Sequence, residues 1–379
     1  QLAKQSLTRT VTPLESSTGP VVPRSGRRVI LLCSNDYLGL ATHPAVIRAA
    51  VRATEQYGAG AGAARLICGT LPPHEELETS LADFKGTEAA LMFGSGYVAN
   101  LGVIPGLIGQ QGLILADRLS HASLIDACRL SGADFRVFRH RDLAKVESLL
   151  KRRAASRPTQ IVTDGLFSMD GDMAPLPELA SLSKQYDAML YVDDAHGTGV
   201  MGPTGRGTLE QLGVEHDVPF HMGTLGKALG SNGAYVAGPR DLIQYLINTA
   251  RPFIFTTAPP PSSAAAASAA LAVIRRDPER RSRLWANRHR LYTGLQQRGF
   301  RLTDTVSPIL PILIGSAEQA LAFSEQLLAH GVYAPAIRPP TVPDDTSRIR
   351  VTITSEHTTD HIDEALRAFE LAGRATGVL

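Results

Sequence analysis

The sequence predicts an α/β protein with two parts: a large domain built on a mostly parallel sheet, and a small C-terminal α+β domain. Short apolar runs alternate with stretches of helical spacing, which is typical of a parallel sheet covered by helices on both faces. Polar residues follow several of these runs, where the strands would end. The pattern changes after the prolines at 259–261. We therefore expect an arm and first strand in residues 1–40, the large domain in 41–260 and the small domain in 261–379.

Composition and charge exclude several classes of protein. The chain has 379 residues, 44% of them hydrophobic, and its formal net charge of +2 is too small to predict binding to nucleic acid or to a membrane surface. The apolar run 264–274 is too short to span a bilayer. The 3 cysteines show no paired spacing, which argues against disulfides and against a metal site. No signal-peptide pattern is visible, so we expect a cytoplasmic protein.

The N-terminal segment begins with a polar stretch rich in proline and glycine, and we expect a loop or arm over residues 1–30. Residues 29–32 then predict a short strand, and 44–57 have helical spacing that stops at Gly58. The stretch 58–63 matches the G-x-G-x-x-A dinucleotide-binding fingerprint. That fingerprint requires a strand before it, whereas a helix precedes it here, so we reject dinucleotide binding.

The remaining elements follow from the same periodicities. We expect strands of the large sheet at residues 89–93, 113–116, 135–138, 160–163, 189–192 and 234–237, with helices at 75–81, 143–152 and 176–186. In the small domain we expect one long helix from Ser262 past Arg290, strands at 309–314 and 348–354, and helices at 317–330 and 360–372. The basic stretch 275–290 alternates with acidic residues, so we interpret it as a solvated helix face.

Lys227 lies among small residues in the segment TLGKALG. Such neighbours allow a bulky planar ligand to approach the amine, and a partly desolvated lysine has a lowered pKa and acts as a neutral nucleophile. This amine can bond to a carbonyl-bearing cofactor such as pyridoxal 5′-phosphate (PLP). A solvated lysine on a glycine-rich loop is the alternative, and the rest of the chain decides between them.

Three polar clusters follow predicted strands and a fourth follows residues 220–222, and parallel sheets bind ligands beyond the carboxyl ends of their strands. Asp193 at such an end would keep a pyridine nitrogen protonated, His196 would donate to a phenolic oxygen, and His121 would lie over the ring. Asp194 fits a helix cap or turn better. The four clusters are Asp117 with His121, Asp164 with Ser168, residues 193–197, and Thr224 with Lys227.

Two further patterns suit anionic groups. The glycine turn in GSGYVAN follows a strand and starts a helix, so Gly96 and Tyr97, with Thr224, can hold a phosphate. Arg348 and Arg350 share one face of a predicted strand, where a guanidinium can grip a substrate carboxylate with two hydrogen bonds. An exposed, ion-paired strand is the alternative explanation for the arginines.

Seven motifs, in order, resemble those of the α-oxoamine synthases: SNDYLGL, GSGYVAN, LSHASLIDA, FSMDGD, VDDAHGTGV, TLGKALG and AIRPPTVPDDTSRIR. The match runs from about Ser34 to Thr354. These enzymes are PLP-dependent transferases of fold type I, the aspartate-aminotransferase-like fold. The resemblance implies this fold, PLP as the cofactor, and a homodimer with shared active sites.

The resemblance also implies roles for single residues. Lys227, His121 and Asp193 would be catalytic. The residues implied to bind the cofactor are Gly96, Tyr97, His121, Ser168, Asp193, His196, Thr224, Lys227 and, toward a neighbouring subunit, Thr256 and Thr257. Those implied to bind substrate are Arg9, Asn35, His121, Thr341 and Arg350.

The segment 338–343 most resembles the family branch of biotin synthesis, which condenses L-alanine with a pimeloyl thioester. Other branches join glycine to acetyl-CoA or succinyl-CoA. A plain PLP aminotransferase and a non-catalytic PLP-fold subunit are the remaining alternatives. The chain departs from the family at Asp164, where many relatives have glutamate, at Asp345, a common glycine, and at Ala63, which interrupts a pattern of small residues and serine.

Overall fold

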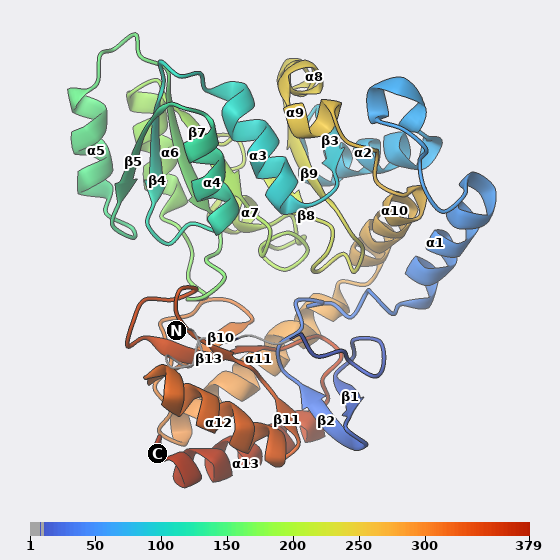
Figure 1. Cartoon of the computed structure of the whole chain (residues 1–379), viewed down its shortest axis with the longest axis vertical. Helices are drawn as coiled ribbons and strands as arrows, with labels where there is room; N and C mark the ends of the chain where they lie inside the picture. The colour runs from blue at the N-terminus through green and yellow to red at the C-terminus, as the bar shows by residue number, and fades with distance from the viewer. Residues whose placement is uncertain (1–7, 9–10) are drawn as a thin grey trace. The chain divides into compact units, whose positions relative to one another are not determined.

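A sheet of seven strands has the order β3-β9-β8-β7-β6-β4-β5 (Figure 1). The strands are β3 Ala89–Phe93, β4 Leu113–Asp117, β5 Asp134–Phe138, β6 Thr159–Asp164, β7 Met189–Asp193, β8 His221–Thr224 and β9 Ala234–Gly238. Neighbours from β5 to β8 are parallel, whereas β9 is antiparallel to β8 and β3. The predicted mostly parallel sheet is confirmed. An apolar run does not reveal strand direction, so the antiparallel β9 was beyond the prediction.

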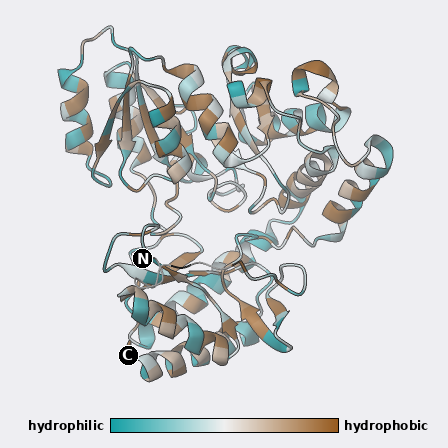
Figure 2. Cartoon of the chain, in the orientation of Figure 1, coloured by the Kyte–Doolittle hydropathy of each residue, from teal (hydrophilic) through white to brown (hydrophobic). Residues whose placement is uncertain are grey.

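Helices cover both faces of this sheet, because successive side chains of a strand point to opposite faces. One apolar cluster joins the sheet to α3 Gly96–Leu107, α4 Ala122–Leu130, α8 Arg240–Thr249 and α9 Arg251–Ile254. The other joins it to α5 Leu143–Arg152, α6 Leu176–Gln185 and α7 Thr208–Leu212. Figure 2 shows apolar residues along the strands and on one side of the covering helices.

Four further helical segments belong with this sheet: α1 Pro44–Tyr57, the π-helical turn η2 Arg65–Gly69, α2 Pro72–Lys85 and α10 Pro261–Arg276. Both α1 and α2 pack against α10. The expected single helix from Ser262 past Arg290 was wrong. Asp277 leaves the helical conformation (φ −124°, ψ 71°), and Pro278 lacks the N–H that a continuing helix needs, so α11 Glu279–Gln297 is a separate helix.

Two small sheets and three helices form the other part of the chain. One sheet has the order β1-β2-β11 and the other β10-β13-β12. The strands are β1 Val21–Arg24, β2 Arg27–Leu31, β10 Ile309–Gly315, β11 Val332–Tyr333, β12 Ala336–Ile337 and β13 Ser347–Thr352. With α11, the helices are α12 Ala317–Ala329 and α13 Thr359–Thr376.

The N-terminal segment contains a strand that the sequence did not predict. β1 pairs antiparallel with β2, although residues 1–30 were expected to be a loop. Pro23 weakened the strand pattern, but β1 is an edge strand, where a proline is tolerated. The connecting Ser25 and Gly26 both have positive φ (51° and 71°), as two-residue hairpin turns require.

This computed structural model describes residue 8 and residues 11–379, and the chain divides into two compact units. One contains His43–Phe167 and Met173–Asp277; the other contains residues 1–42, Ser168–Asp172 and Pro278–Leu379. The division differs from the expected boundaries, because α10 belongs to the unit of the large sheet and the N-terminal segment to the other unit. Across the described residues, no helix has the length and apolar character needed to cross a membrane.

Burial of His357 should make stability depend on pH. Its Nδ1 accepts the Thr354 N–H at 3.1 Å, and its Nε2 lies 3.2 Å from the Leu31 carbonyl. Burial, followed by the charge of His361, lowers the pKa of His357 from 6.5 to about 4. Between these values the unfolded chain binds a proton that the folded chain does not, so stability is full above pH 6.5 and falls as the pH drops.

We expect this group to lower the unfolding free energy by about 2 kcal/mol between pH 7 and pH 5. Urea denaturation at the two pH values would compare the wild type with His357→Gln, which carries no charge at either pH. His289→Gln, an exposed histidine of α11, is the matched control and should keep the full pH dependence. An unchanged dependence in His357→Gln would contradict the assignment.

Candidate active site

Four neighbouring strands end on buried polar residues at one edge of the large sheet. β8, β7, β6 and β4 lie side by side and parallel, and their last residues are Thr224, Asp193, Asp164 and Asp117. All four residues are buried. The structure therefore brings together the strand-end residues that the sequence singled out, at the edge where parallel α/β sheets bind ligands.

Asp193 is held at both carboxylate oxygens. Oδ1 accepts the N–H of Ala195 at 3.0 Å, and Oδ2 accepts from Nδ2 of Asn100 at 2.8 Å. An ionised carboxylate has about four acceptor sites, so lone pairs remain for a ligand. The side chain is only 4% exposed, which means that its orientation is set by these contacts and not by water.

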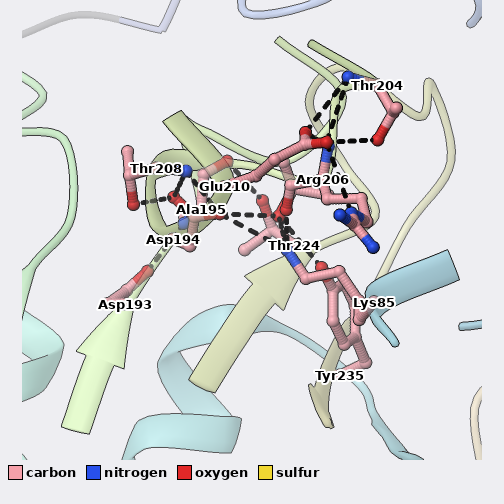
Figure 3. Close-up of polar contacts among 11 residues, drawn as sticks. Lys85, Asp193, Asp194, Ala195, Thr204, Arg206, Thr208, Glu210, Thr224 and Tyr235 are labelled. Carbon is pink, nitrogen blue, oxygen red and sulfur yellow. Dashed lines mark hydrogen bonds and ion pairs between the residues drawn. The ribbon is translucent and has the colours of Figure 1, made fainter. Parts of the chain in front are cut away.

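The adjacent Asp194 anchors the turn that follows β7 (Figure 3). It accepts the backbone N–H of Thr208 at 3.1 Å and its hydroxyl at 2.7 Å, so it satisfies the first N–H of α7, whose N-cap residue is Gly207. Lys85, reaching from α2, lies 3.4 Å from its other oxygen and also donates to the Arg206 carbonyl. Burial raises the pKa of Asp194, and Lys85 partly offsets this rise.

Lys227 lies in the turn after β8, half-buried, and its Nζ is 3.3 Å from the Thr224 hydroxyl oxygen. That hydroxyl donates to the Ala195 carbonyl at 3.2 Å, so the lysine turn is joined to the turn that carries Asp193. His196 follows Ala195 in the same turn and is buried. Lys227 and Asp193, the amine and the carboxylate that the sequence predicted to act together, therefore belong to two turns that are joined by a hydrogen bond.

The N-terminus of α3 approaches the same edge. Ser95 caps the helix by accepting the Val98 N–H at 3.3 Å. A Cβ at Gly96 would lie 2.8 Å from Cγ2 of Thr224, so only glycine allows this close approach. Helix N-termini have unpaired N–H groups and favour anions, which fits a phosphate beside Gly96 and Thr224. Tyr97 is 41% exposed, and its hydroxyl bonds to Asp126.

His121 is the N-cap of α4, and its backbone N–H donates to Asp164 at 2.9 Å. The residue is exposed in the single chain, yet partial burial of the imidazole is the main cause that lowers its pKa. Asp193 raises this pKa and Lys227 lowers it, which places both groups within electrostatic range of the ring. An imidazole with a lowered pKa is neutral near pH 7.

Asp164 is a buried carboxylate among other carboxylates. Burial raises its pKa well above the usual value, and the neighbouring Asp193 raises it further, while the His121 N–H acts in the opposite direction. Two adjacent carboxylates at the ends of β6 and β7 do not both ionise easily. Asp193, at the end of the neighbouring strand, has the Ala195 N–H and the Asn100 amide as donors to its two oxygens.

A second group of predicted residues lies in the other unit. Arg350 is buried; its Nε donates to the Ser168 carbonyl at 2.5 Å, and both terminal nitrogens lie 3.2 Å from Oδ1 of Asn35. Arg348 is also buried and pairs with Asp170 at 2.7 Å. The alternative of an exposed arginine strand is therefore wrong, and Arg350 has neutral oxygens as its hydrogen-bond partners here.

The remaining predicted residues are scattered. Thr341 is exposed, and its N–H donates to the Arg338 carbonyl at 3.1 Å. Thr256 and Thr257 are also exposed, and Thr257 forms a bridge with Ala64. Arg9 lies outside the described residues.

Four supporting residues were missed by the sequence reasoning: Lys85, Asn100, Ser123 and Tyr191. Asn100 contacts Asp193 and Ser123 contacts His121, whereas Tyr191 contacts Asn100 and Lys85 contacts Asp194. No expected ligand touches them, so their residue types gave no chemical signal. Only Asn100 carried a usable sign, because it follows Gly96 by one helical turn and therefore shares its face of α3.

Comparison with known proteins gives full-length matches. Residues 27–369 match the family described as aminotransferase class I and II. The 8-amino-7-oxononanoate synthase of Geobacter sulfurreducens is 48% identical over 382 residues, covering 100% of this chain and 97% of the relative.

Two solved structures are also similar. A serine palmitoyltransferase variant from S. paucimobilis with bound PLP gives a TM-score of 0.96 at 36% identity, covering 100% of this chain and 96% of that one. The 8-amino-7-oxononanoate synthase of Francisella tularensis gives 0.79 at 28% identity, covering 92% and 98%. These matches confirm the predicted resemblance and the predicted fold.

Replacing Lys85 with methionine should destabilise the protein strongly, because Asp194 would stay buried without its cation. Removal of one partner of a buried ion pair typically costs about 3–5 kcal/mol. Adding Asp194→Asn, which keeps acceptor and donor capacity without charge, should restore most of the loss. Lys151→Met, at an exposed pair with Glu147, is the matched control and should change little. Urea denaturation would measure all four proteins; equal effects of the two single lysine replacements would contradict this role.

Proposed function

The chain belongs to the aminotransferase class I and II family, and from this premise we propose that it condenses L-alanine with a pimeloyl thioester to 8-amino-7-oxononanoate, a step of biotin synthesis. The proposal makes it a PLP-dependent acyltransferase. The observation that carries it is that the relatives named for this activity match along the whole chain. The polar strand-end group around Lys227 and Asp193 provides the chemistry such an activity needs.

The proposed product follows from its carbon skeleton. The pimeloyl group supplies the seven carbons from the acid to the ketone, and alanine supplies the amine-bearing carbon and its methyl group. The alanine carboxylate leaves as CO2, and the thiol carrier leaves from the acyl carbon. The bond formed joins alanine Cα to that carbon, so the reaction needs a base for the Cα proton, a sink for electrons and a donor to the thioester oxygen.

The residues present fit PLP on three observations. Lys227 offers an amine that is half-buried, next to a hydroxyl. Asp193 keeps free lone pairs on a fixed, buried carboxylate, as a protonated pyridine nitrogen requires. Gly96 leaves no room for a side chain where the α3 N-terminus meets Thr224, as a phosphate cradle requires. When bound, PLP supplies a carbonyl that links to amines and a ring that accepts electrons.

The protein's own groups have separate tasks. Lys227 would hold the cofactor and then take the alanine Cα proton on Nζ. Asp193 would keep a proton on the ring nitrogen, His196 would contact the phenolic oxygen, and His121 would cover the ring and donate to the thioester oxygen. Arg350, with Asn35, would bind the alanine carboxylate through its guanidinium. Ser168 and Thr341 remain proposed contacts of cofactor and substrate.

We also propose a homodimer. Ile67 of η2 is 79% exposed and Phe255 is 71% exposed, and the two segments are joined by the Ala64–Thr257 bridge. Such large exposed apolar side chains on adjacent segments favour burial against a partner. Thr256 and Thr257 directly follow Phe255 in the chain, and Thr257 forms that bridge, so they would face a second copy. The three cysteines are all unpaired, which supports the proposed cytoplasmic location.

A second candidate joins L-serine to a long-chain acyl thioester. It is favoured by the solved structures, since the serine palmitoyltransferase matches with higher identity and TM-score than the synthase structure does. The curated relatives point to alanine and pimeloyl, with identities well above either structure. Both candidates need the same Lys227 and Asp193, so the cofactor site does not separate them.

Lys227→Ala should abolish both the visible absorbance of bound PLP and product formation, because the variant has no amine to bond the cofactor. Borohydride treatment followed by peptide mass spectrometry should locate the cofactor label on residue 227 of the wild type. Lys145→Ala, an exposed lysine of α5, is the control and should keep the absorbance and the label. A labelled lysine elsewhere would refute the site.

A panel of substrates separates the two candidates. Purified protein would be given alanine, serine or glycine with pimeloyl, acetyl, succinyl or palmitoyl thioesters, each on coenzyme A, and pimeloyl also on an acyl carrier protein. We expect the mass of 8-amino-7-oxononanoate and CO2 release from alanine with pimeloyl. A main product from serine and palmitoyl, or from glycine and a short acyl group, would overturn the proposed substrates but leave the cofactor assignment intact.

A further inference from the structure

A buried line of hydrogen bonds connects Asp193 with His121 through two side chains that touch no expected ligand. Nδ2 of Asn100 lies 2.8 Å from Oδ2 of Asp193 and 2.9 Å from Oγ of Ser123. Oγ of Ser123 lies 2.7 Å from Nδ1 of His121. Tyr191 also bonds to Asn100, with its hydroxyl 2.8 Å from Oδ1 of the amide. Asn100, Ser123 and Tyr191 are at most 1% exposed.

The proton positions along this line follow from the groups themselves. An ionised carboxylate only accepts hydrogen bonds, so the nitrogen of the Asn100 amide must face Asp193. Its two hydrogens then serve Asp193 and Ser123, and its oxygen accepts from Tyr191. The Ser123 oxygen accepts from Asn100, which leaves the serine hydroxyl hydrogen available for donation to His121 Nδ1.

A second donor supports the same direction at His121. The backbone N–H of Ser123 points at Nδ1 from 3.3 Å, and a backbone N–H cannot accept. Nδ1 is therefore an acceptor for both donors and carries no proton. Burial also lowers the pKa of His121, which favours the neutral ring, so its single proton lies on Nε2.

We propose that Asn100 and Ser123 are positioning residues, which fix the orientation of Asp193 and hold His121 as the neutral tautomer with its proton on Nε2. Nε2–H is then a hydrogen-bond donor, and Nδ1 is not available to the substrate. Resting on the proposed function, this gives the thioester carbonyl oxygen a donor whose direction is set by the protein. One amide thus aligns the two residues that would contact opposite parts of the cofactor ring.

The tautomer can be measured without any turnover. Protein labelled with ¹⁵N in its histidines and loaded with PLP would give ring-nitrogen signals, and the His121 pair is assigned by its loss in His121→Gln. We expect the shifts and couplings of an Nε2–H imidazole at pH 7.5. An Nδ1–H ring in the wild type would overturn the proposal, whatever the variants do.

Ser123→Ala removes the hydroxyl of the line. We expect the His121 signals to move toward a mixture of the two tautomers, and kcat to fall roughly 10- to 100-fold with little change in the alanine KM. Ser123→Thr restores a hydroxyl and should recover the wild-type signals. The matched control is Ser183→Ala on α6, a buried serine whose hydroxyl bonds to the Ala180 carbonyl, and it should change neither readout.

The outcomes remain distinct from those of the proposed function. Unchanged His121 signals in Ser123→Ala would overturn the proposal even if alanine and pimeloyl thioester are the substrates. If the wild type instead makes another product, the tautomer of His121 is still tested by the ring-nitrogen spectrum alone. Should Ser123→Ala fail to fold, Tyr191→Phe is a milder change that removes the donor to Asn100 Oδ1. Wild-type His121 signals and wild-type kcat in that variant would contradict the proposed role of Asn100.

Discussion

The requirement to bury two consecutive carboxylates at the end of β7 governs the structure of the candidate site. A buried charge is costly unless it is paired or hydrogen-bonded. Asp194 meets this requirement with Lys85 and the start of α7, and Asp193 meets it with Ala195 and Asn100. The two sets of partners draw α2, α3 and α7 to one point, so the fold and the site share the same constraint.

Asp193 and Asp194 have different roles because their hydrogen-bond partners differ. Asp194 accepts from a cation and from a helix start and is completely buried, so it has a structural task. Asp193 accepts only from neutral N–H groups, which orient the carboxylate without neutralising it. It can therefore still bind a cationic ring nitrogen. Burial, followed by the neighbouring Asp193, raises the pKa of Asp164 at the end of the adjacent strand.

The sequence predicted the residues expected to contact cofactor and substrate better than it predicted the residues that support them. Asp193, Thr224 and Lys227 could be found because strand ends of a parallel sheet share one edge. Lys85 and Tyr191 could not, since Lys85 reaches Asp194 from α2 and Tyr191 reaches Asn100 on α3, and no local pattern encodes where those helices pack. The helix break at Asp277 shows the same limit at the level of the fold. The helical spacing of apolar residues continues through Asp277, but the backbone of this residue is not helical.

Two histidines of the same unit show that burial alone does not make a functional residue. His221, at the start of β8, is buried, and burial lowers its pKa well below the usual value, but neither ring nitrogen has a hydrogen-bond partner among the described residues. Nothing selects its tautomer. His121 has a more open ring, yet two donors converge on one nitrogen. The backbone N–H of Ser123 can only donate, so it fixes which nitrogen of His121 accepts and gives this neutral imidazole a defined chemical task.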